Sequence, residues 1–66
     1  MTTGELLRAA REKVVISQAK LASLTGMHRQ QLYRYEKGIN EPELPQLRLL
    51  ARALGVEPGE LIGRDG

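Results

Sequence analysis

Residues 17–38 read SQAKLASLTGMHRQQLYRYEKG, and they contain two short helical patterns with a single glycine between them. Ser17 is a residue type that often caps the start of a helix, and Gly26 is typical of the left-handed residue that ends one. The spacing of the apolar residues predicts one helix over about residues 17–25 and another over about residues 28–37. This stretch is therefore expected to fold as two helices joined by a tight turn.

The second of these helices has a narrow apolar side and a wide polar side. Leu32 and Tyr35 fall on one side, where they are expected to meet the core. The opposite side carries two columns at i, i+4 spacing that no acidic residue interrupts: Arg29, Tyr33 and Lys37, and Gln30 with Arg34. Solvated helix faces usually mix both signs of charge, whereas arginine and glutamine can bond bidentately to base edges in a major groove. From this helix alone, two interpretations of its polar side stay open: a face exposed to solvent and a contact with nucleic acid.

The rest of the chain predicts three more helices and no strand. Residues that favour strands are scattered and do not alternate over a useful length. Thr2 and Glu5 have the spacing of a capping box at the start of the first helix. The predicted ranges are Thr3–Val14, Leu44–Leu54 and a short final helix that Pro58 opens. We therefore predict an all-α fold, a compact five-helix domain that spans residues 1–66.

The length and composition limit the kinds of protein that fit. Sixty-six residues make one domain, and without cysteine the chain has neither a disulfide nor a thiolate zinc site. A single histidine cannot form a metal site alone, and the sequence has no nucleophile–base pair or glycine-rich phosphate loop. We therefore expect no enzyme activity, no metal, no cofactor and no small-molecule ligand. No apolar run is long enough for a signal sequence or a membrane span, which favours a cytoplasmic protein without membrane association.

Charge is distributed unevenly along the chain, although the net charge is only +2. From Arg8 to Lys37 there are seven Lys or Arg residues and two Glu residues. From Gly38 to Gly66 there are three Arg residues and five acidic residues. One half of the molecule is therefore basic and the other slightly acidic, as expected where only one side meets a polyanion. RNA is less favoured than DNA, because the major groove of A-form RNA is too narrow for a helix.

The opening stretch is similar to the Cro/repressor family of helix-turn-helix DNA-binding domains, the xenobiotic-response-element type. The family motif is matched at four places, Ser17-Gln18, Leu21-Ala22, Gly26 and Glu36-Lys37-Gly38. Residues 41–62, EPELPQLRLLARALGVEPGELI, likewise resemble the fourth and fifth helices of the family. The resemblance implies a lambda-repressor-like fold and sequence-specific binding of double-stranded DNA by a transcriptional regulator, with repression as the expected effect.

The resemblance also implies which side chains read the bases. Arg29, Gln30 and Arg34 match the base-reading positions of the family. Their chemistry agrees, because arginine pairs with guanine and glutamine with adenine, each pairing contributing about 1–3 kcal/mol of discrimination. Tyr33 lies between them and is expected to contact a thymine methyl group or a phosphate. The alternative for Tyr33 is an exposed tyrosine without a partner.

Four further residues are expected to contact the DNA backbone. Gln18, at the start of the first helix of the motif, is expected to meet a phosphate with help from nearby backbone amides, unless it only faces solvent. Lys37 and Asn40 flank the second helix and are expected to contact the backbone without reading sequence. His28 stands where the family prefers Ser or Thr. It either contacts phosphate or remains a partly buried neutral histidine.

Three other positions carry structural expectations. Arg11 and Glu36 match a residue pair of the family, so the resemblance implies an ion pair that holds the second helix of the motif against the first helix of the chain. Val15 stands where a glycine often ends that first helix. Because a left-handed valine is strained, we expect the turn at Val15 to take another shape.

Two apolar residues suggest self-association. Leu49 lies off the apolar stripe of its helix and, with Ile62, is expected to form a dimer contact, so that a homodimer binds a palindromic site. The alternative function is an antitoxin-like or adaptor domain whose basic helix binds an acidic protein. Salt dependence and base preference distinguish the two functions, because DNA binding weakens log-linearly with salt and depends on sequence.

Overall fold

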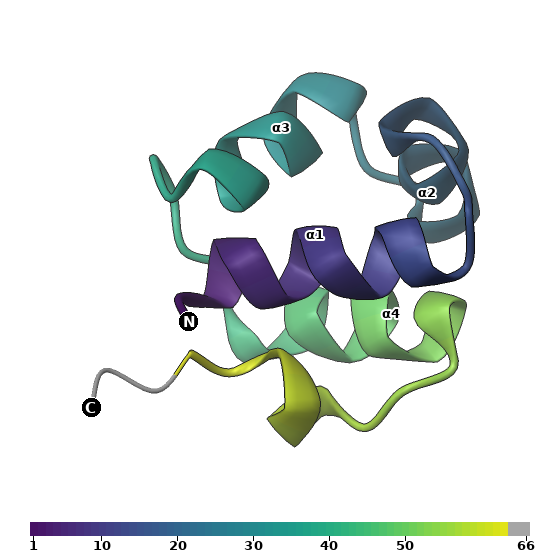
Figure 1. Cartoon of the computed structure of the whole chain (residues 1–66). Helices are drawn as coiled ribbons and strands as arrows, with labels where there is room; N and C mark the ends of the chain where they lie inside the picture. The colour runs from purple at the N-terminus through teal and green to yellow at the C-terminus, as the bar shows by residue number, and fades with distance from the viewer. Residues whose placement is uncertain (64–66) are drawn as a thin grey trace.

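The computed structural model describes residues 1–63, and every regular element within this range is helical. The predicted all-α class is therefore confirmed, while the last three residues of the predicted 1–66 domain lie outside the described range. No helix among residues 1–63 is both long and apolar enough to cross a bilayer. Figure 1 shows the elements in order: α1 (Thr3–Lys13), α2 (Gln18–Thr25), α3 (Arg29–Lys37), α4 (Leu44–Leu54) and the 3-10 turn η1 (Pro58–Leu61).

The predicted fifth helix is wrong in type, because η1 is a single 3-10 turn. The N–H of Glu60 donates to the carbonyl of Glu57 at 2.9 Å, which is the i→i+3 pattern. Gly59 weakens helix formation inside the turn, and Ile62 is already extended, with φ −84° and ψ 120°. The four residues between Glu57 and the extended Ile62 are too few for a series of α-helical hydrogen bonds, although Leu61 still packs in the core.

Side-chain caps begin α1 and α2 as the sequence predicts. The backbone N–H of Glu5 donates to Thr2 Oγ1 at 3.1 Å, and the backbone N–H of Thr2 donates to the Glu5 carboxylate at 2.8 Å. This reciprocal pair is the predicted capping box. Ser17 Oγ accepts from the N–H of Lys20 at 3.0 Å. Gly26 ends α2 at φ +72°, in the left-handed region that glycine tolerates, and the chain turns directly into α3.

Val15 corrects the expectation for the turn after α1. Its φ is +57°, so the residue is left-handed despite its branched side chain. The N–H groups of Val15 and Ile16 donate to the carbonyls of Glu12 and Arg11 at 3.0 and 3.4 Å, which is the Schellman closure of a helix with a left-handed residue at this position. The Val15 side chain remains 87% exposed, while Ile16 packs against the core. Helix closure and the burial of Ile16 therefore outweigh the local strain.

Each of the five elements contributes one fully buried leucine to the core. Burying one such side chain stabilises the fold by about 2 kcal/mol. Leu32 and Tyr35 both face this core, as predicted, so the opposite side of α3 is directed away from it. The five leucines, each no more than 1% exposed, are Leu7 in α1, Leu21 in α2, Leu32 in α3, Leu50 in α4 and Leu61 in η1.

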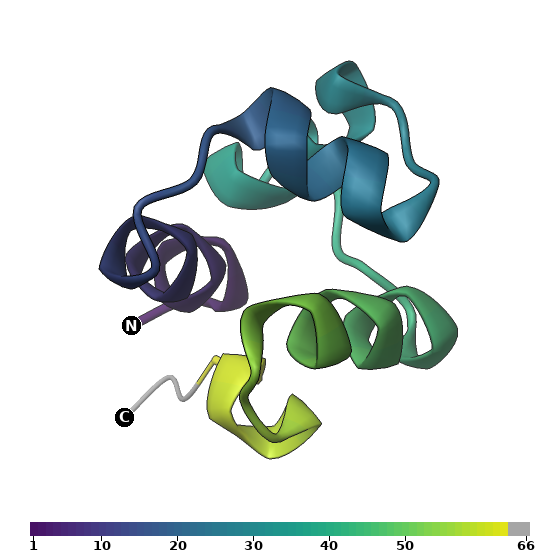
Figure 2. The ribbon, with the colours of Figure 1, turned by 90° about the vertical axis from the view of Figure 1, so that its right-hand side faces the viewer.

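The elements are arranged so that α2 and α3 lie together at one end of the molecule, η1 lies at the other end, and α1 and α4 lie between them (Figures 1 and 2). α1 approaches the backbone of α3 closely at Gly4, where a Cβ would lie 2.5 Å from the carbonyl oxygen of Tyr35. The N–H of Gly63 donates to Thr3 Oγ1 at 2.8 Å, which joins the segment after η1 to the start of α1. α1 therefore links both ends of the molecule.

Candidate nucleic-acid interface

α3 displays five polar side chains on the side that points away from the core. The acidic residue of this helix, Glu36, is buried, so no carboxylate of α3 lies among them. Because Leu32 is fully buried on the inner side, the orientation of the outer side is fixed by core packing. We call the outer side the α3 face, and its exposed residues are Arg29, Gln30, Tyr33, Arg34 and Lys37.

Tyr33 and Lys37 interact with one another on this face. The ammonium nitrogen of Lys37 lies 5.8 Å from the centroid of the Tyr33 ring, within the range of a cation–π contact. Both side chains are exposed, so the contact contributes only about 0.5 kcal/mol. Its main consequence is geometric, because it holds the Lys37 charge along the column that begins at Arg29.

Two hollows flank the α3 face. The first, of about 420 Å³, lies where the start of α2 meets α3 and is lined by Gln18 from α2 with Arg29, Gln30 and Tyr33. The second, of about 280 Å³, brings in residues on either side of α3. It is lined by His28, Gln30, Gln31, Arg34 and Asn40. The structure therefore places predicted backbone-contact residues at both edges of the predicted base-reading residues.

Arg11 and Glu36 form a bidentate ion pair between α1 and α3. Arg11 Nε donates to Glu36 Oε2 at 2.6 Å, and Arg11 Nη2 donates to Oε1 at 3.0 Å. A third donor of Arg11, Nη1, bonds to the carbonyl of Ile16 at 2.8 Å. The hydrogen bond to Glu36 raises the pKa of Arg11, against the lowering effect of burial. The arginine therefore stays charged while it holds α3 and the turn before α2 against α1.

Gln18 makes a contact that sequence reasoning missed. Its amide nitrogen donates to Glu36 Oε1 at 3.1 Å, so the side chain is half-buried and does not simply face solvent. Its other neighbours are the side chains of the first hollow, beside the α3 face. No sequence signal pointed to this contact, because Gln18 and Glu36 are 18 positions apart along the chain.

A family model described as Helix-turn-helix matches residues 7–61, which is most of the chain. The chain belongs to the Cro/repressor-type helix-turn-helix family. The resemblance seen in the sequence is therefore confirmed, and the fold is that of a lambda/P22 repressor-like DNA-binding domain.

Known proteins that are similar to this helix-turn-helix domain agree with that assignment. The restriction-modification controller protein C.AhdI from Aeromonas hydrophila is 37% identical, with a TM-score of 0.87 over 91% of this chain and 87% of that chain. The P22 c2 repressor protein, crystallised in complex with synthetic operator 9T, is 32% identical, with a TM-score of 0.90 over 98% of both chains. An uncharacterized HTH-type transcriptional regulator of Sinorhizobium fredii, y4wC, is 38% identical over 83% of this chain and 38% of its own length. The chain spans less than half the length of the curated relatives it matches.

His28 departs from the helix-turn-helix family pattern at the start of α3. It occupies the N-cap position with an extended backbone, but its side chain makes no capping hydrogen bond. The side chain is exposed and lines the second hollow, so the expectation of a partly buried histidine is wrong. An imidazole is poorly shaped to cap a helix, so the His28 ring does not bond to the backbone at the start of α3. It lies instead at the edge of the α3 face.

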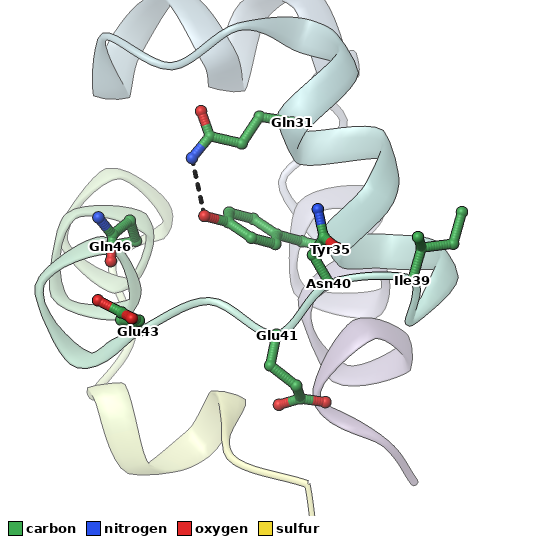
Figure 3. A pocket seen from close by; sticks show the side chains of 7 residues that line it. All are labelled: Gln31, Tyr35, Ile39, Asn40, Glu41, Glu43 and Gln46. Atoms are coloured by element: carbon green, nitrogen blue, oxygen red, sulfur yellow. Dashed lines mark hydrogen bonds between the residues drawn. The ribbon is translucent and has the colours of Figure 1, made fainter.

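A third hollow marks where the basic surface of the helix-turn-helix domain ends. It has a volume of about 620 Å³ and lies between α3 and the start of α4 (Figure 3). At its wall, the Gln31 amide donates to the hydroxyl of Tyr35 at 2.8 Å. Glu41 and Glu43 also line it, so its charge would repel a phosphate. The surface suited to a polyanion therefore stops near Asn40.

The two residues predicted at a dimer contact are both exposed. Leu49 lies on α4 and Ile62 directly follows η1, with 46% and 51% of their surfaces accessible. Both therefore lie outside the helix-turn-helix motif and its α3 face. Their role in dimer formation stays a prediction.

Proposed function

We propose that this domain binds double-stranded DNA sequence-specifically, with α3 in the major groove, as a transcriptional regulator that represses. The observation that carries the proposal is the α3 face, whose cationic and amide side chains are exposed while Leu32 and Glu36 lie buried behind them. A major groove admits one α-helix, and the side chains of this face have the donors that base edges accept. The similarity to the P22 c2 repressor, whose crystal structure is a complex with a synthetic operator, supports the same function.

Within this proposal, three residues of the α3 face read bases. Arg29 and Arg34 suit guanine O6 and N7, and Gln30 suits the N6 and N7 groups of adenine. Gln30 lines both hollows beside the face, and this central position supports a contact at the groove floor. Tyr33 contacts a thymine methyl group or a phosphate from the same face.

Four residues position the domain on the DNA backbone. Gln18 is the first residue of α2, where free backbone N–H groups and the helix dipole favour a phosphate. His28 and Asn40 lie at the other edge of the α3 face, and Lys37 lies in the last turn of α3. Contacts of this kind fix register and contribute affinity without reading sequence.

We further propose that the domain binds a palindromic site as a homodimer through Leu49 and Ile62. Two exposed apolar side chains outside the DNA-facing end support this contact. A two-fold dimer places its recognition helices in major grooves about one helical turn apart. Sedimentation of the domain on a palindromic duplex tests this: a dimer that Leu49→Glu disrupts supports the contact, and a monomer on that duplex removes it.

Selection of bound duplexes from a random pool tests the main proposal. The wild-type chain is expected to enrich a discrete motif, and Arg29→Ala and Arg34→Ala are each expected to lose preference at a separate base pair. Arg8→Ala is the matched control, since Arg8 is an exposed arginine of α1 that pairs with Glu12 of the same helix. Enrichment of no motif, together with salt-sensitive binding to an acidic protein, would favour the antitoxin-like or adaptor function instead.

A further inference from the structure

The buried carboxylate of Glu36 accepts hydrogen bonds from two different residues. Besides the two bonds from Arg11, its Oε1 accepts from Gln18 Nε2 at 3.1 Å. The Glu36 side chain is only 2% exposed. Water therefore cannot easily take the place of the Gln18 amide. If the hydrogen bond from Gln18 is lost, the buried Oε1 atom of Glu36 lacks one of its donors.

This carboxylate also determines which way round the Gln18 amide lies. An ionised carboxylate only accepts hydrogen bonds, whereas an amide has a donor end and an acceptor end. The nitrogen of Gln18 must therefore face Glu36, and the bond between them uses one of its two hydrogens. Gln18 also lines the hollow beside Arg29 and Gln30, at the edge of the α3 face. The second hydrogen is thus available at that edge.

We propose that Glu36 is a positioning residue for DNA binding, because it holds the Gln18 amide with its second N–H directed at a phosphate beside the start of α2. This inference rests on the proposed function. The backbone N–H groups at the start of α2 present their positive end to the same phosphate. Arg11 neutralises Glu36, so the carboxylate does not repel the phosphate that it helps to bind. The ion pair then supports DNA affinity as well as helix packing.

A double-mutant cycle separates positioning from packing. The proteins are the wild-type chain, Gln18→Met, the paired replacement Arg11→Met with Glu36→Leu, and all three changes together. The paired replacement removes both charges at once, because an apolar pair of similar volume is often tolerated where a single unpaired charge is not. Affinity for the duplex recovered from the random pool is measured for each protein as a function of salt. Gln46→Met in α4 is the matched control, since this glutamine lines the third hollow, beside Glu41 and Glu43, and does not lie on the α3 face.

The cycle is expected to be non-additive. Losing one hydrogen bond to phosphate weakens binding about five-fold, so Gln18→Met and the paired replacement each bind about five-fold more weakly. The triple variant binds no more weakly than Gln18→Met, since both changes remove the same contact. The salt slope and the base preference stay unchanged, because neither change alters the net charge or a base-reading residue. A paired replacement with full affinity, or fully multiplicative losses, overturns the proposal.

Side-chain NMR of the wild-type protein gives a test that does not depend on the folding of variants. The Gln18 amide hydrogen that is bonded to Glu36 is expected to exchange with solvent more slowly in the free protein than the amide hydrogens of exposed glutamines. Addition of the selected duplex should move mainly the second hydrogen. A Gln18 amide that resembles exposed glutamines, or that ignores bound DNA, overturns the positioning role. If the wild-type chain selects no duplex, it is the proposed function that fails.

Discussion

Gly4 of α1 lies directly against the backbone of Tyr35 in α3, so that a Cβ on Gly4 would be 2.5 Å from the Tyr35 carbonyl oxygen and 2.7 Å from that of Glu36. Gly4→Ala is therefore expected to lower the free energy of unfolding by about 1–3 kcal/mol, since backbone atoms must move apart. The gain in helix propensity from alanine, about 1 kcal/mol, opposes this loss but is too small to cancel a backbone clash. Urea denaturation measures the difference.

Gly59→Ala is the control for this substitution. A Cβ on Gly59 meets nothing within 4 Å, and its φ is not in the left-handed region. The alanine there should leave stability unchanged or raise it by up to about 1 kcal/mol, because it restricts only the unfolded chain. Equal effects of the two alanines would show that the contact between α1 and α3 is not as close as described.

Because Arg11 and Glu36 form a buried ion pair, we expect a single substitution in the pair to cause a large loss of stability. Arg11→Met leaves the Glu36 carboxylate buried without its cation, which costs about 3–5 kcal/mol in comparable pairs. Replacing both residues, Arg11→Met with Glu36→Leu, should recover most of that loss, since no charge is then left unpaired. Thermal melts of the two variants check this, and an Arg11→Met protein that melts like the wild type contradicts it.

Val15 predicts a gain in stability. A left-handed conformation costs a residue with a Cβ about 1–2 kcal/mol, whereas glycine costs about 0.5–1 kcal/mol in backbone entropy. Val15→Gly should therefore raise the free energy of unfolding by about 0.5–1 kcal/mol, because the valine side chain is exposed and little packing is lost. Val14→Gly is the control, since Val14 has a φ of −92° and should gain nothing. A stabilised Val14→Gly protein would point to a general loop effect instead.

The local signals of the sequence predicted the helices and the position of the α3 face. Ser17 as a cap, Gly26 as a turn residue and the apolar spacing of Leu32 and Tyr35 act within a few residues, so they can be read without the fold. The ion pair of Arg11 came from family resemblance rather than from spacing, because its partner is distant along the chain.

Features that depend on contact between distant segments were not predictable in this way. The close approach at Gly4 and the bond from Gly63 to Thr3 require that the packing of α1 be known first. Val15 was misjudged because strain at one residue was weighed without the closure of α1 and the burial of Ile16. Gln18 was expected either at phosphate or facing solvent, since a lone residue gives no sign of its bond to a buried carboxylate.

The capping box of α1 predicts a small acid dependence of stability. The backbone N–H of Thr2 and then its hydroxyl lower the pKa of Glu5. Because the pKa is lower in the folded state, the contribution of Glu5 is present above its unfolded pKa and is lost as the pH falls through the folded value. The stability difference between wild type and Glu5→Gln should therefore shrink in acid. Carboxyl NMR titration checks the direction, and a Glu5 pKa at or above its unfolded value contradicts it.

Lys37 and Arg34 should differ in how their loss changes DNA binding, although both are exposed cations of α3. Lys37, proposed at a phosphate, releases a counterion on binding, so Lys37→Ala should lower the slope of log affinity against log salt by about 0.9 and weaken all sequences alike. Arg34→Ala should instead remove about 1–3 kcal/mol of the discrimination between the preferred base and the others at one position of the site. Tyr33→Leu frees the Lys37 ammonium from its ring contact and should leave the salt slope unchanged, because the charge of Lys37 remains. Titration of selected and scrambled duplexes at several salt concentrations measures these effects. A Lys37→Ala protein that loses preference at one position while keeping the full salt slope would place Lys37 at a base instead.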